Sequence, residues 1–429
     1  LLAAALAVGA IAVVIDDRLR PRQIEHVLTH SSAAVLLAAG ELLARLPRPL
    51  RTTARVRLAG DAARAGRLAP LRRIPPDLAQ IVYTSGSTGL PKGVVLSHGN
   101  LWAGTAAVRS YLRIEAGDRL AGVLPLAFDY GLNQLLCAVD AGAAWAVERS
   151  PVPQRVVRTL REAGVTVLAA VPPLWLALLG VEDFSARLPA LRAMTNSGGR
   201  LPVPAVRRLR ASQPQAALVL MYGLTEAFRS TYLAPERVDA KPASIGRAIP
   251  GAEVLVLRED LTPCDVREHG QLAHRGPTVA VGYWDDPQAT AGTFVADPLR
   301  PPGAPATDRV VLSGDLVYRD EDGDLFFVGR ADRMIKTLGY RVSPDEVVEA
   351  LHASGEVAEA VVTAEPDELR GARIVAYAVL REGASFARLE AFLARELPTH
   401  MQPARIELRD AIARTPNGKH DVAQTAGRP

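Results

Sequence analysis

The chain has 429 residues, of which 48% are hydrophobic and 22% are charged, and its formal net charge is +4. This length predicts about three domains or subdomains, and the composition excludes a disordered tail and a multi-span membrane protein. Arginines are spread along the chain and aromatic residues make up only 5%, so the sequence disfavours nucleic-acid binding. Its two cysteines are far apart in the sequence, which indicates neither disulfides nor a thiolate metal site and favours a cytoplasmic location.

The uncharged run from Leu1 to Ile15 is too short to span a bilayer, which takes about 20 residues. No basic region precedes it, as a signal peptide requires, so we expect no stable membrane insertion. Gly9 divides the run into a half rich in alanine and leucine and a β-branched half. This pattern predicts a buried helix followed by a buried strand.

Short apolar runs rich in β-branched residues alternate with helical stretches between about Ile81 and Met221. Such alternation predicts an α/β core with mostly parallel strands. From about Ser244 to Val328 the pattern changes to short strands separated by glycine and proline turns. This second region is predicted to form a small β-barrel-like subdomain.

The pattern changes again after Arg330. Residues 343–346, Ser-Pro-Asp-Glu, are typical of a helix start with a capping box. An alternating strand is expected at 373–380, and a second helix at about 386–397. These elements predict a small α+β unit at the C-terminal end.

The most informative segment runs from Tyr83 to Gly93, between two β-rich runs. Its glycines allow backbone N–H groups to close around phosphate oxygens, its hydroxyls add hydrogen bonds, and its lysine adds a point charge. The Gly-Lys-Ser/Thr triplet of a Walker A loop is absent. The segment therefore predicts a polyphosphate-binding loop of a different kind, with these candidate residues: Thr84, Ser85, Gly86, Ser87, Thr88, Gly89 and Lys92.

This segment resembles the phosphate loop of the AMP-forming acid ligases, a family of acyl-CoA synthetases, aryl-CoA ligases, luciferases and adenylation domains of peptide synthetases. Further motifs resemble those of the family in the same order over nearly the whole chain. They lie at residues 196–199 (Asn-Ser-Gly-Gly), 221–226 (Met-Tyr-Gly-Leu-Thr-Glu), 282–284 (Gly-Tyr-Trp), 313–315 (Ser-Gly-Asp), 329–332 (Gly-Arg-Ala-Asp) and 416–419 (Pro-Asn-Gly-Lys). The chain looks most like stand-alone bacterial acyl-CoA or acyl-carrier ligases.

The resemblance implies an α/β fold in two parts. Residues 1–331 would form a large AMP-binding part, with two α/β subdomains and the small β-barrel-like subdomain. Residues 332–429 would form a small, mobile α+β domain that begins at a hinge residue, Asp332.

The resemblance also implies a nucleotide site. An aromatic-glycine pair stacks on the adenine in the family, and a glycine pair runs along the other side of the base. The ribose hydroxyls bind a carboxylate, and an arginine gives a second contact on the ribose side. In that order, the matching residues here are Tyr222 and Gly223, Gly198 and Gly199, Asp315, and Arg330. Alone, each would be read as a turn or a surface ion pair.

Four further residues match catalytic positions of the family. Thr225 resembles a phosphate contact, and Glu226 resembles a ligand of Mg²⁺, a hard cation that carboxylate oxygen suits. Lys419 is similar to the lysine that lies between the acid carboxylate and the α-phosphate, where a compact cation stabilises developing charge. Lys336 precedes a segment that is similar to the loop used in the second half-reaction.

The implied reaction has two steps and uses ATP and Mg²⁺. A small-molecule carboxylic or amino acid is first activated as acyl-AMP, with release of pyrophosphate. The acyl group then passes to the thiol of CoA or of phosphopantetheine on an acyl or peptidyl carrier protein. Positioning and electrostatics carry both steps.

The choice of acid is less clear from the sequence. Phe128, Asp129 and Tyr130 resemble the segment that lines the acid pocket. Asp129 stands roughly where amino-acid-activating members place an aspartate against the substrate ammonium, which indicates an amino acid or another polar acid. It could equally cap the helix that follows. Both interpretations stay open at this point.

Family members carry a segment before the position of Leu1, so we expect part of the first α/β subdomain to be lacking. Two alternatives therefore stand beside an acyl-CoA ligase. One is an amino-acid adenylation enzyme that loads a peptidyl carrier protein. The other is a catalytically dead nucleotide-binding fragment.

The chain contains only four lysines, against 46 arginines. Lys92, Lys336 and Lys419 lie in motifs that would bind phosphate or approach the acyl group, where a compact ammonium fits better than a forked guanidinium. Lys241 lies in no such motif, and the sequence assigns it no role.

Overall fold

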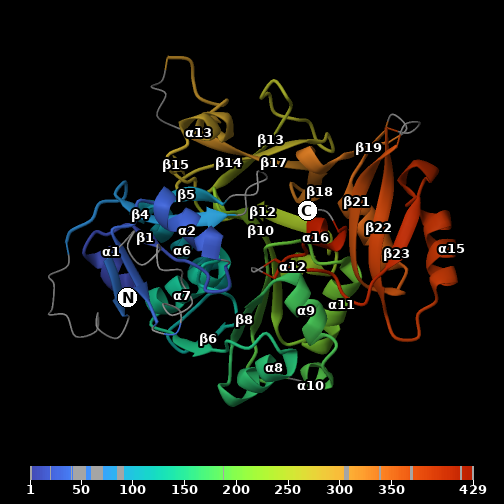
Figure 1. Cartoon of the computed structure of the whole chain (residues 1–429), viewed down its shortest axis with the longest axis horizontal. Coiled ribbons are helices and arrows are strands. Elements are labelled where there is room, and N and C mark those ends of the chain that lie inside the picture. The colour runs from blue at the N-terminus through green and yellow to red at the C-terminus, as the bar shows by residue number, and fades with distance from the viewer. Residues whose placement is uncertain are drawn as a thin grey trace.

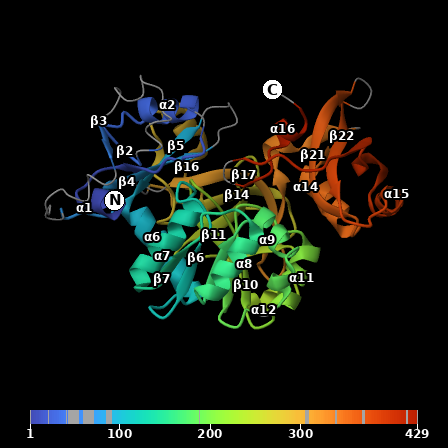
Figure 2. The same ribbon diagram turned by 60° about the horizontal axis from the view of Figure 1, so that its bottom comes forward.

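The computed structural model describes residues 2–19, 21–39, 41, 55–58, 71–84, 91–186, 188–303, 309–337, 340–367, 371–415 and 418–427. The N-terminal elements and the C-terminal three-stranded sheet lie at opposite ends of the molecule (Figure 1). The C-terminal segment with α16 (Val422–Thr425) lies between that sheet and the large part of the molecule (Figures 1 and 2). Among the described helices, none has both the length and the apolar character needed to cross a membrane.

A four-stranded sheet holds the two ends of the predicted phosphate loop. Its strand order is β1-β4-β5-β15, and β4 and β5 form an antiparallel hairpin. Strand β15 comes from far along the chain and pairs with β5. The elements of this region are α1 (Leu2–Ala7), β1 (Ala12–Val13), α2 (Pro21–His30), β4 (Leu78–Thr84), β5 (Lys92–Ser97) and β15 (Gly282–Tyr283), with a separate parallel pair, β2 (Val35–Ala38) and β3 (Arg55–Leu58).

The predicted N-terminal helix and strand are both present as α1 and β1. The expectation that the helix is buried was wrong, because none of the residues of α1 is buried. This short helix remains partly exposed, and its Leu6 is only partly buried where it packs against a core cluster. Ala12 of β1 is buried, as predicted.

The centre of the molecule is a twelve-stranded sheet, whose parallel part has the order β10-β9-β8-β6-β7. Along β8, Leu168 and Ala170 face one core, and Val167 and Ala169 face the other. Both faces of a parallel sheet must be covered, and side chains alternate between them with a period of two. The parallel strands are β6 (Arg119–Gly122), β7 (Ala144–Val147), β8 (Val167–Ala170), β9 (Ala193–Asn196) and β10 (Ala217–Leu224).

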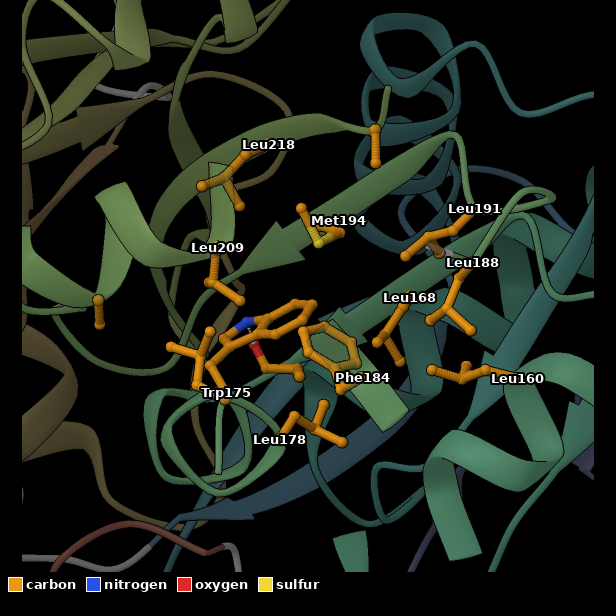
Figure 3. Packing of buried hydrophobic residues seen from close by; sticks show 14 of the residues in the cluster. Leu160, Leu168, Trp175, Leu178, Phe184, Leu188, Leu191, Met194, Leu209 and Leu218 are labelled. Atoms are coloured by element: carbon orange, nitrogen blue, oxygen red, sulfur yellow. Dashed lines mark hydrogen bonds between the residues drawn. The ribbon is translucent and has the colours of Figure 1, made fainter. Parts of the chain in front are cut away.

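Helices cover both faces of the parallel strands. On one face, Trp175 and Phe184 are fully buried, and the Trp175 indole N–H donates to the carbonyl oxygen of Ala170 at 3.1 Å (Figure 3). On the other face, the core contains Val108 and Cys137. The first face carries α8 (Pro153–Glu162), α9 (Pro172–Leu178), α10 (Glu182–Ser185), α11 (Val203–Ser212) and α12 (Pro235–Val238), and the second carries α6 (His98–Leu112) and α7 (Asp129–Ala141).

The rest of the twelve-stranded sheet is antiparallel. The short strands predicted between Ser244 and Val328 are present, and they extend the same sheet through β12. This arrangement joins the nucleotide-site motifs on β17 and β18 to those on β10. The elements are β11 (Phe228–Leu233), β12 (Ser244–Ala248), β13 (Glu253–Leu257), β14 (Gly270–Arg275), α13 (Pro287–Thr293), β16 (Phe294–Ala296), β17 (Arg309–Arg319) and β18 (Leu325–Arg330).

The C-terminal region forms a small α+β unit with its own core, as predicted. Ser343 is the N-cap of α14, although its hydroxyl accepts from the backbone N–H of Asp345 and not from that of Glu346. The strand order is β21-β22-β23. The elements are the 3-10 turn η1 (Ala331–Arg333), β19 (Ile335–Thr337), β20 (Tyr340–Val342), α14 (Pro344–Ala353), β21 (Val357–Asp367), β22 (Gly371–Leu380), α15 (Phe386–Glu396), the 3-10 turn η2 (Thr399–Met401) and β23 (Arg405–Leu408).

Candidate active site

The sequence motifs converge at one edge of the parallel sheet. Gly198 and Gly199 follow β9 after one intervening residue, and Tyr222 lies near the end of the neighbouring strand β10. Phe128 follows β6 and is the N-cap of α7. Ligands of α/β proteins bind outside the carboxyl ends of parallel strands, so this edge is the candidate site.

Tyr222 and Gly223 occupy a tightly packed corner of this edge. The Tyr222 ring stacks on His274 with ring centroids 5.9 Å apart. Burial lowers the pKa of His274 to about 3, so that ring is neutral. A Cβ atom at Gly223 would lie 2.1 Å from the backbone oxygen of Phe228, so this position requires glycine.

Asp315 and Arg330 lie opposite each other on β17 and β18. Asp315 is buried and accepts a hydrogen bond from the Tyr222 hydroxyl, and its Oδ1 lies 3.2 Å from Nη1 of Arg330. Burial raises the pKa of Asp315, against the opposing effects of Tyr222 and Arg330. The structure thus brings the predicted ribose-binding pair beside the predicted adenine-binding tyrosine.

The two ends of the predicted phosphate loop face each other, because Thr84 pairs with Lys92 in the β4–β5 hairpin. The other predicted loop residues, Ser85, Gly86, Ser87, Thr88 and Gly89, lie outside the described residues. Lys92 Nζ is 5.4 Å from the centre of the Tyr283 ring. The Tyr283 hydroxyl in turn donates to Glu226 Oε1 at 2.7 Å, so a chain of contacts joins the loop to the predicted metal ligand.

Two histidines of α2, which sequence reasoning missed, hold both ends of this loop. His26 Nε2 is 2.9 Å from the backbone oxygen of Pro91, and His30 Nδ1 is 2.8 Å from the Tyr83 hydroxyl. The backbone oxygen of His30 also accepts from the Trp284 indole. In the sequence, the only sign of this arrangement is that His26 and His30 are four residues apart, which places them on one face of a helix.

The predicted acid-pocket residues lie at the start of α7. A Cβ atom at Gly198, where φ is +77°, would lie 3.1 Å from the Phe128 ring, so the two residues are in close contact. Tyr130 is buried and its hydroxyl hydrogen-bonds Thr195 at 2.5 Å. Thr225 and Asp129 line one narrow cavity, which has room for about one water molecule.

Asp129 does not cap α7 as an N-cap residue, because Phe128 holds that position. It is the first residue of the helix, and its Oδ1 accepts from the backbone N–H of Tyr130 at 2.8 Å. Its Oδ2 lies 3.5 Å from Nη1 of Arg229, a buried residue of β11 that sequence reasoning assigned no role.

Lys419 reaches this edge from the C-terminal region. Its Nζ is 5.7 Å from the centre of the Phe128 ring. Lys419 is exposed, and a partial loss of hydration near neighbouring protein groups lowers the pKa of its ammonium. The carboxylates of Asp129, Asp315 and Glu226 oppose that shift in pKa, which places all three within electrostatic reach of the ammonium.

The two remaining predicted residues are only partly described. Asp332 lies in η1, and Lys336 lies in β19 opposite Arg341, but the side chains of Asp332 and Lys336 are outside the described part of the chain. Arg333, beside the predicted hinge, contributes a repulsion that lowers the pKa of Lys419. The structure therefore brings Lys419 to the site and leaves the role of Lys336 as a prediction.

The C-terminal unit is held against the large part by contacts of α14. Glu349 Oε1 accepts from the backbone N–H of Val203 at 3.2 Å, and Oε2 lies 3.8 Å from Nη2 of Arg200. Both partners follow the glycine pair at the end of β9. These contacts of the C-terminal unit thus lie beside the candidate nucleotide site.

Comparisons with known proteins agree with this geometry. A family model described as AMP-binding enzyme matches residues 1–284, and one described as AMP-binding enzyme C-terminal domain matches residues 346–419.

Two curated relatives and one solved structure illustrate the likeness. Tyrocidine synthase 3 of Brevibacillus parabrevis is 31% identical over 434 residues, which cover 97% of this chain and 6% of that protein. The L-proline–(L-prolyl-carrier protein) ligase of Pseudomonas fluorescens is 30% identical over 438 residues, which cover 97% of this chain and 84% of the ligase. The ATP-bound structure of MatB from Rhodopseudomonas palustris has a TM-score of 0.86 at 24% identity, over 98% of this chain and 84% of MatB, a likeness in fold.

Proposed function

The chain belongs to the AMP-binding enzyme family, and from this premise we propose that it activates a carboxylic acid with ATP as acyl-AMP and then transfers the acyl group to a thiol. The observation that carries the proposal is the position of Lys419. A lysine from the C-terminal region lies beside the acid-pocket residue Phe128 and within electrostatic reach of Glu226 and Asp315.

The nucleotide would bind along the edge formed by β9, β10 and the β17–β18 pair. The adenine would stack on Tyr222, with Gly198 and Gly199 along its other side. Asp315 would accept hydrogen bonds from the ribose hydroxyls, and Arg330 would give a second contact on the ribose side. The Tyr222 hydroxyl, which now donates to Asp315, would then share the Asp315 carboxylate with the ribose or move away from it. The triphosphate would lie towards Thr225, Lys92 and the loop of residues 84–89.

Glu226 is the residue that fits Mg²⁺ here. Tyr283 fixes one carboxylate oxygen, Oε1, and among the described residues no group donates a hydrogen bond to Oε2. An oxygen held in place and left without a donor suits a hard cation. Bound there, Mg²⁺ would neutralise charge on the phosphates.

In the first step, a carboxylate oxygen of the acid attacks the α-phosphorus of ATP. The bond from the α-phosphorus to the oxygen that bridges it to the β-phosphorus breaks, and pyrophosphate leaves with that electron pair. Lys419 would lie between the attacked phosphate and the acid, where its charge stabilises both oxygens. The lowered pKa of Lys419 reflects an ammonium that has lost part of its hydration before the anionic substrates arrive.

In the second step, a thiolate sulfur attacks the acyl carbon, the bond from that carbon to the AMP oxygen breaks, and the thiol proton passes to solvent. We propose that residues 332–429 turn about Asp332 relative to residues 1–331 to admit the thiol, and that the segment after Lys336 then enters the site. Breaking the Glu349 contacts with Arg200 and Val203 would free the C-terminal unit for that motion.

The thiol would belong to CoA or to phosphopantetheine on a carrier protein. The printed name of the Pseudomonas fluorescens relative includes a carrier protein, which supports the second acceptor as a candidate. The same relative supports amino-acid loading as an alternative function. The neutralisation of Asp129 by Arg229 disfavours that alternative, because both oxygens of the aspartate already have partners.

Nucleotide products distinguish the candidate functions directly. The protein is incubated with ATP, Mg²⁺ and a panel of carboxylic and amino acids, and nucleotides are separated by chromatography. We expect acid-dependent AMP and pyrophosphate, and exchange of labelled pyrophosphate into ATP without any thiol. ADP would instead indicate a phosphotransferase, and measurable ATP binding without turnover of any acid would indicate a catalytically dead nucleotide-binding fragment.

A further inference from the structure

Lys419 is placed by its backbone and not by contacts of its ammonium. Within the described part of the chain, no hydrogen bond or ion pair holds the Lys419 ammonium, and the centre of the Phe128 ring is 5.7 Å from Nζ. A lysine ammonium is carried on a flexible four-carbon stem. The position of Lys419 therefore depends on how firmly the segment around it is held.

That segment forms a tight hairpin. Arg414 and His420 form an antiparallel bridge. Between them, the backbone N–H of Thr415 donates to the carbonyl oxygen of Lys419 at 2.8 Å, and the N–H of Gly418 donates to the carbonyl oxygen of Thr415 at 2.9 Å. Gly418 has a φ of +78°, a conformation that glycine adopts without strain. We call residues 413–415 and 418–421 the Lys419 hairpin.

One carboxylate oxygen connects both legs of the Lys419 hairpin to the C-terminal sheet. Oε2 of Glu359 accepts a hydrogen bond from Nη2 of Arg414 at 2.8 Å, on the first leg. The same oxygen lies 3.3 Å from Nε2 of His420, on the second leg. Glu359 belongs to β21, a strand whose neighbouring residues Val357 and Ala360 are buried in the core of the C-terminal unit. It is therefore a fixed point for the hairpin.

The two partners keep Glu359 charged. Burial favours the neutral carboxyl group, but His420 and Arg414 outweigh that effect and lower the pKa of Glu359. A carboxylate oxygen can accept from more than one donor, and such bonds are stronger than those between neutral groups. The charge of Glu359 thus draws the two legs of the hairpin to one point.

Lys419 and His420 are neighbours in sequence that turn to different parts of the molecule. His420 contacts β21 inside the C-terminal unit, whereas Lys419 reaches Phe128 in the large part. Successive side chains of an extended chain lie on opposite sides of it. Holding His420 on the sheet therefore directs Lys419 away from the sheet and towards the candidate active site.

A purely stabilising role for Glu359 fits these contacts less well. Its side chain is 26% exposed, and ion pairs that solvent can reach contribute little to stability. The base of the hairpin is also held independently. The Thr425 hydroxyl accepts from the backbone N–H of Ala413 at 3.1 Å and donates to the carbonyl oxygen of Asp421 at 2.6 Å. Loss of Glu359 should therefore loosen the part of the hairpin that carries Lys419 and leave the fold intact.

We propose that Glu359, acting through Arg414 and His420, is a positioning residue that directs Lys419 to the acid carboxylate and the α-phosphate during adenylation. The inference rests on the proposed ligase function. Glu359 and both partners lie within residues 332–429, so they would move together with Lys419 when that part turns. Glu359 should therefore matter for the first half-reaction and not for the second.

Glu359→Ala separates positioning from stability. We expect the kcat of pyrophosphate exchange to fall about 10- to 100-fold, since a displacement of about 1 Å can cost that much. The KM for ATP and the rate of thioester formation from supplied acyl-AMP should each stay within about 2-fold. Glu365→Ala is the matched control, because Glu365 lies on the same strand and also pairs with two arginines, Arg373 and Arg405. It should leave both half-reactions unchanged.

A double variant tests whether Glu359 acts through Lys419. In a Lys419→Ala background, adding Glu359→Ala should change the residual pyrophosphate exchange by less than about 2-fold, because no ammonium is left to position. A merely structural role would lower the exchange in both backgrounds.

Variants of His420 keep the proposal testable if Glu359→Ala does not fold. His420→Gln retains a nitrogen donor, whereas His420→Leu does not. We expect His420→Leu to lose more pyrophosphate exchange than His420→Gln, again without loss of thioester formation from supplied acyl-AMP.

Three results would overturn the inference while leaving the proposed function in place. They are equal losses in the two half-reactions of Glu359→Ala, the same loss with and without Lys419, and unchanged pyrophosphate exchange in both Glu359→Ala and His420→Leu. Absence of pyrophosphate exchange with every acid in the unchanged protein would instead contradict the proposed function. Hydrogen–deuterium exchange of the hairpin amides would then still test the contact, and it should be faster in Glu359→Ala than in Glu365→Ala. Equal rates in these two variants would show that Glu359 does not hold the hairpin.

Discussion

Two lysines of this chain each feel the charge of three acidic side chains, and they differ in whether the protein pairs them. Lys241 Nζ donates hydrogen bonds to Asp320 at 2.5 Å, to Asp322 at 2.6 Å and to Asp324 at 2.8 Å. These bonds raise the pKa of Lys241 although burial works against its charge. The three carboxylates lie within 4.8 Å of one another, a spacing that a metal ion could accept, and the ammonium lies among them instead.

Lys419 acts on Asp129, Asp315 and Glu226 through space, and lost hydration outweighs their attraction and lowers the pKa of its ammonium. Lys241 is thus satisfied by the protein, whereas Lys419 keeps its charge for a ligand. We infer from this difference that Lys241 is a structural cation and propose that Lys419 is a catalytic one, although both are lysines in a chain that otherwise uses arginine.

Replacing Lys419 should lower catalysis, whereas replacing Lys241 should lower stability, and the largest effect is expected on catalysis. Lys419→Ala should lower pyrophosphate exchange by about 100- to 1000-fold, since removing one group that stabilises developing charge costs that much. Its urea unfolding midpoint should remain that of the unchanged protein. Lys241→Ala serves as the matched control, and equal loss of exchange in both variants would contradict the assignment.

The second effect is on stability. Lys241→Met removes the ammonium that the carboxylates of Asp320, Asp322 and Asp324 share. We expect a lower urea unfolding midpoint at pH 7, with little change in the rate of pyrophosphate exchange per folded molecule. The hydrogen bond from Lys241 is the main reason that the pKa of Asp322 is lowered, so the wild type gains stability above the unfolded pKa of the aspartate and loses it in acid. The difference in urea unfolding midpoint between the wild type and Lys241→Met should therefore become smaller as the pH falls below about 4. A gap that widens in acid would contradict this account.

The third effect is on pH dependence. Adenylation needs the protonated Lys419, whose pKa is lowered from the usual 10.5 by burial, so the rate should fall at alkaline pH with an apparent pKa below that value. Lys419→Arg should be slow, because a forked guanidinium replaces a compact ammonium, and its residual rate should show no such alkaline fall. Stopped-flow or exchange rates from pH 7 to 10.5 measure both profiles. The same alkaline fall in the arginine variant would assign it to another group.

The smallest effect concerns the orientation of the C-terminal unit. Glu349→Ala removes its contacts with Arg200 and Val203, and a partly exposed ion pair contributes about 0.2–1 kcal/mol. We expect pyrophosphate exchange to fall by about 2- to 5-fold, with thioester formation from supplied acyl-AMP unchanged or faster. Glu346→Ala on the same helix is the control. A matching loss in both half-reactions would show that Glu349 only stabilises the fold.

Local patterns predicted much of the fold and of the site. Periodicity and caps located α14 and α15, and the alternation of strands and helices located the parallel sheet. Several motif residues, among them Tyr222 and Gly198, lie at the carboxyl edge of that sheet, as their order along the chain implies.

Contacts between distant segments could not be read from the sequence. The hydroxyl of Tyr222 meets Asp315 across 93 residues, and that of Tyr283 meets Glu226 across 57. Periodicity carries no information on such pairs. It also did not reveal that β12 joins the antiparallel strands to the main sheet, or that α1 would remain unburied.

The most direct test of the central claim separates the two half-reactions in Lys419→Ala. Acyl-AMP, made chemically from an acid that the unchanged protein accepts, is supplied together with CoA or a holo carrier protein, and thioester is measured. The account predicts thioester formation within about 3-fold of the unchanged protein, alongside the about 100-fold or greater loss of pyrophosphate exchange. An equal loss of both half-reactions would contradict the placement of Lys419 at the adenylation step.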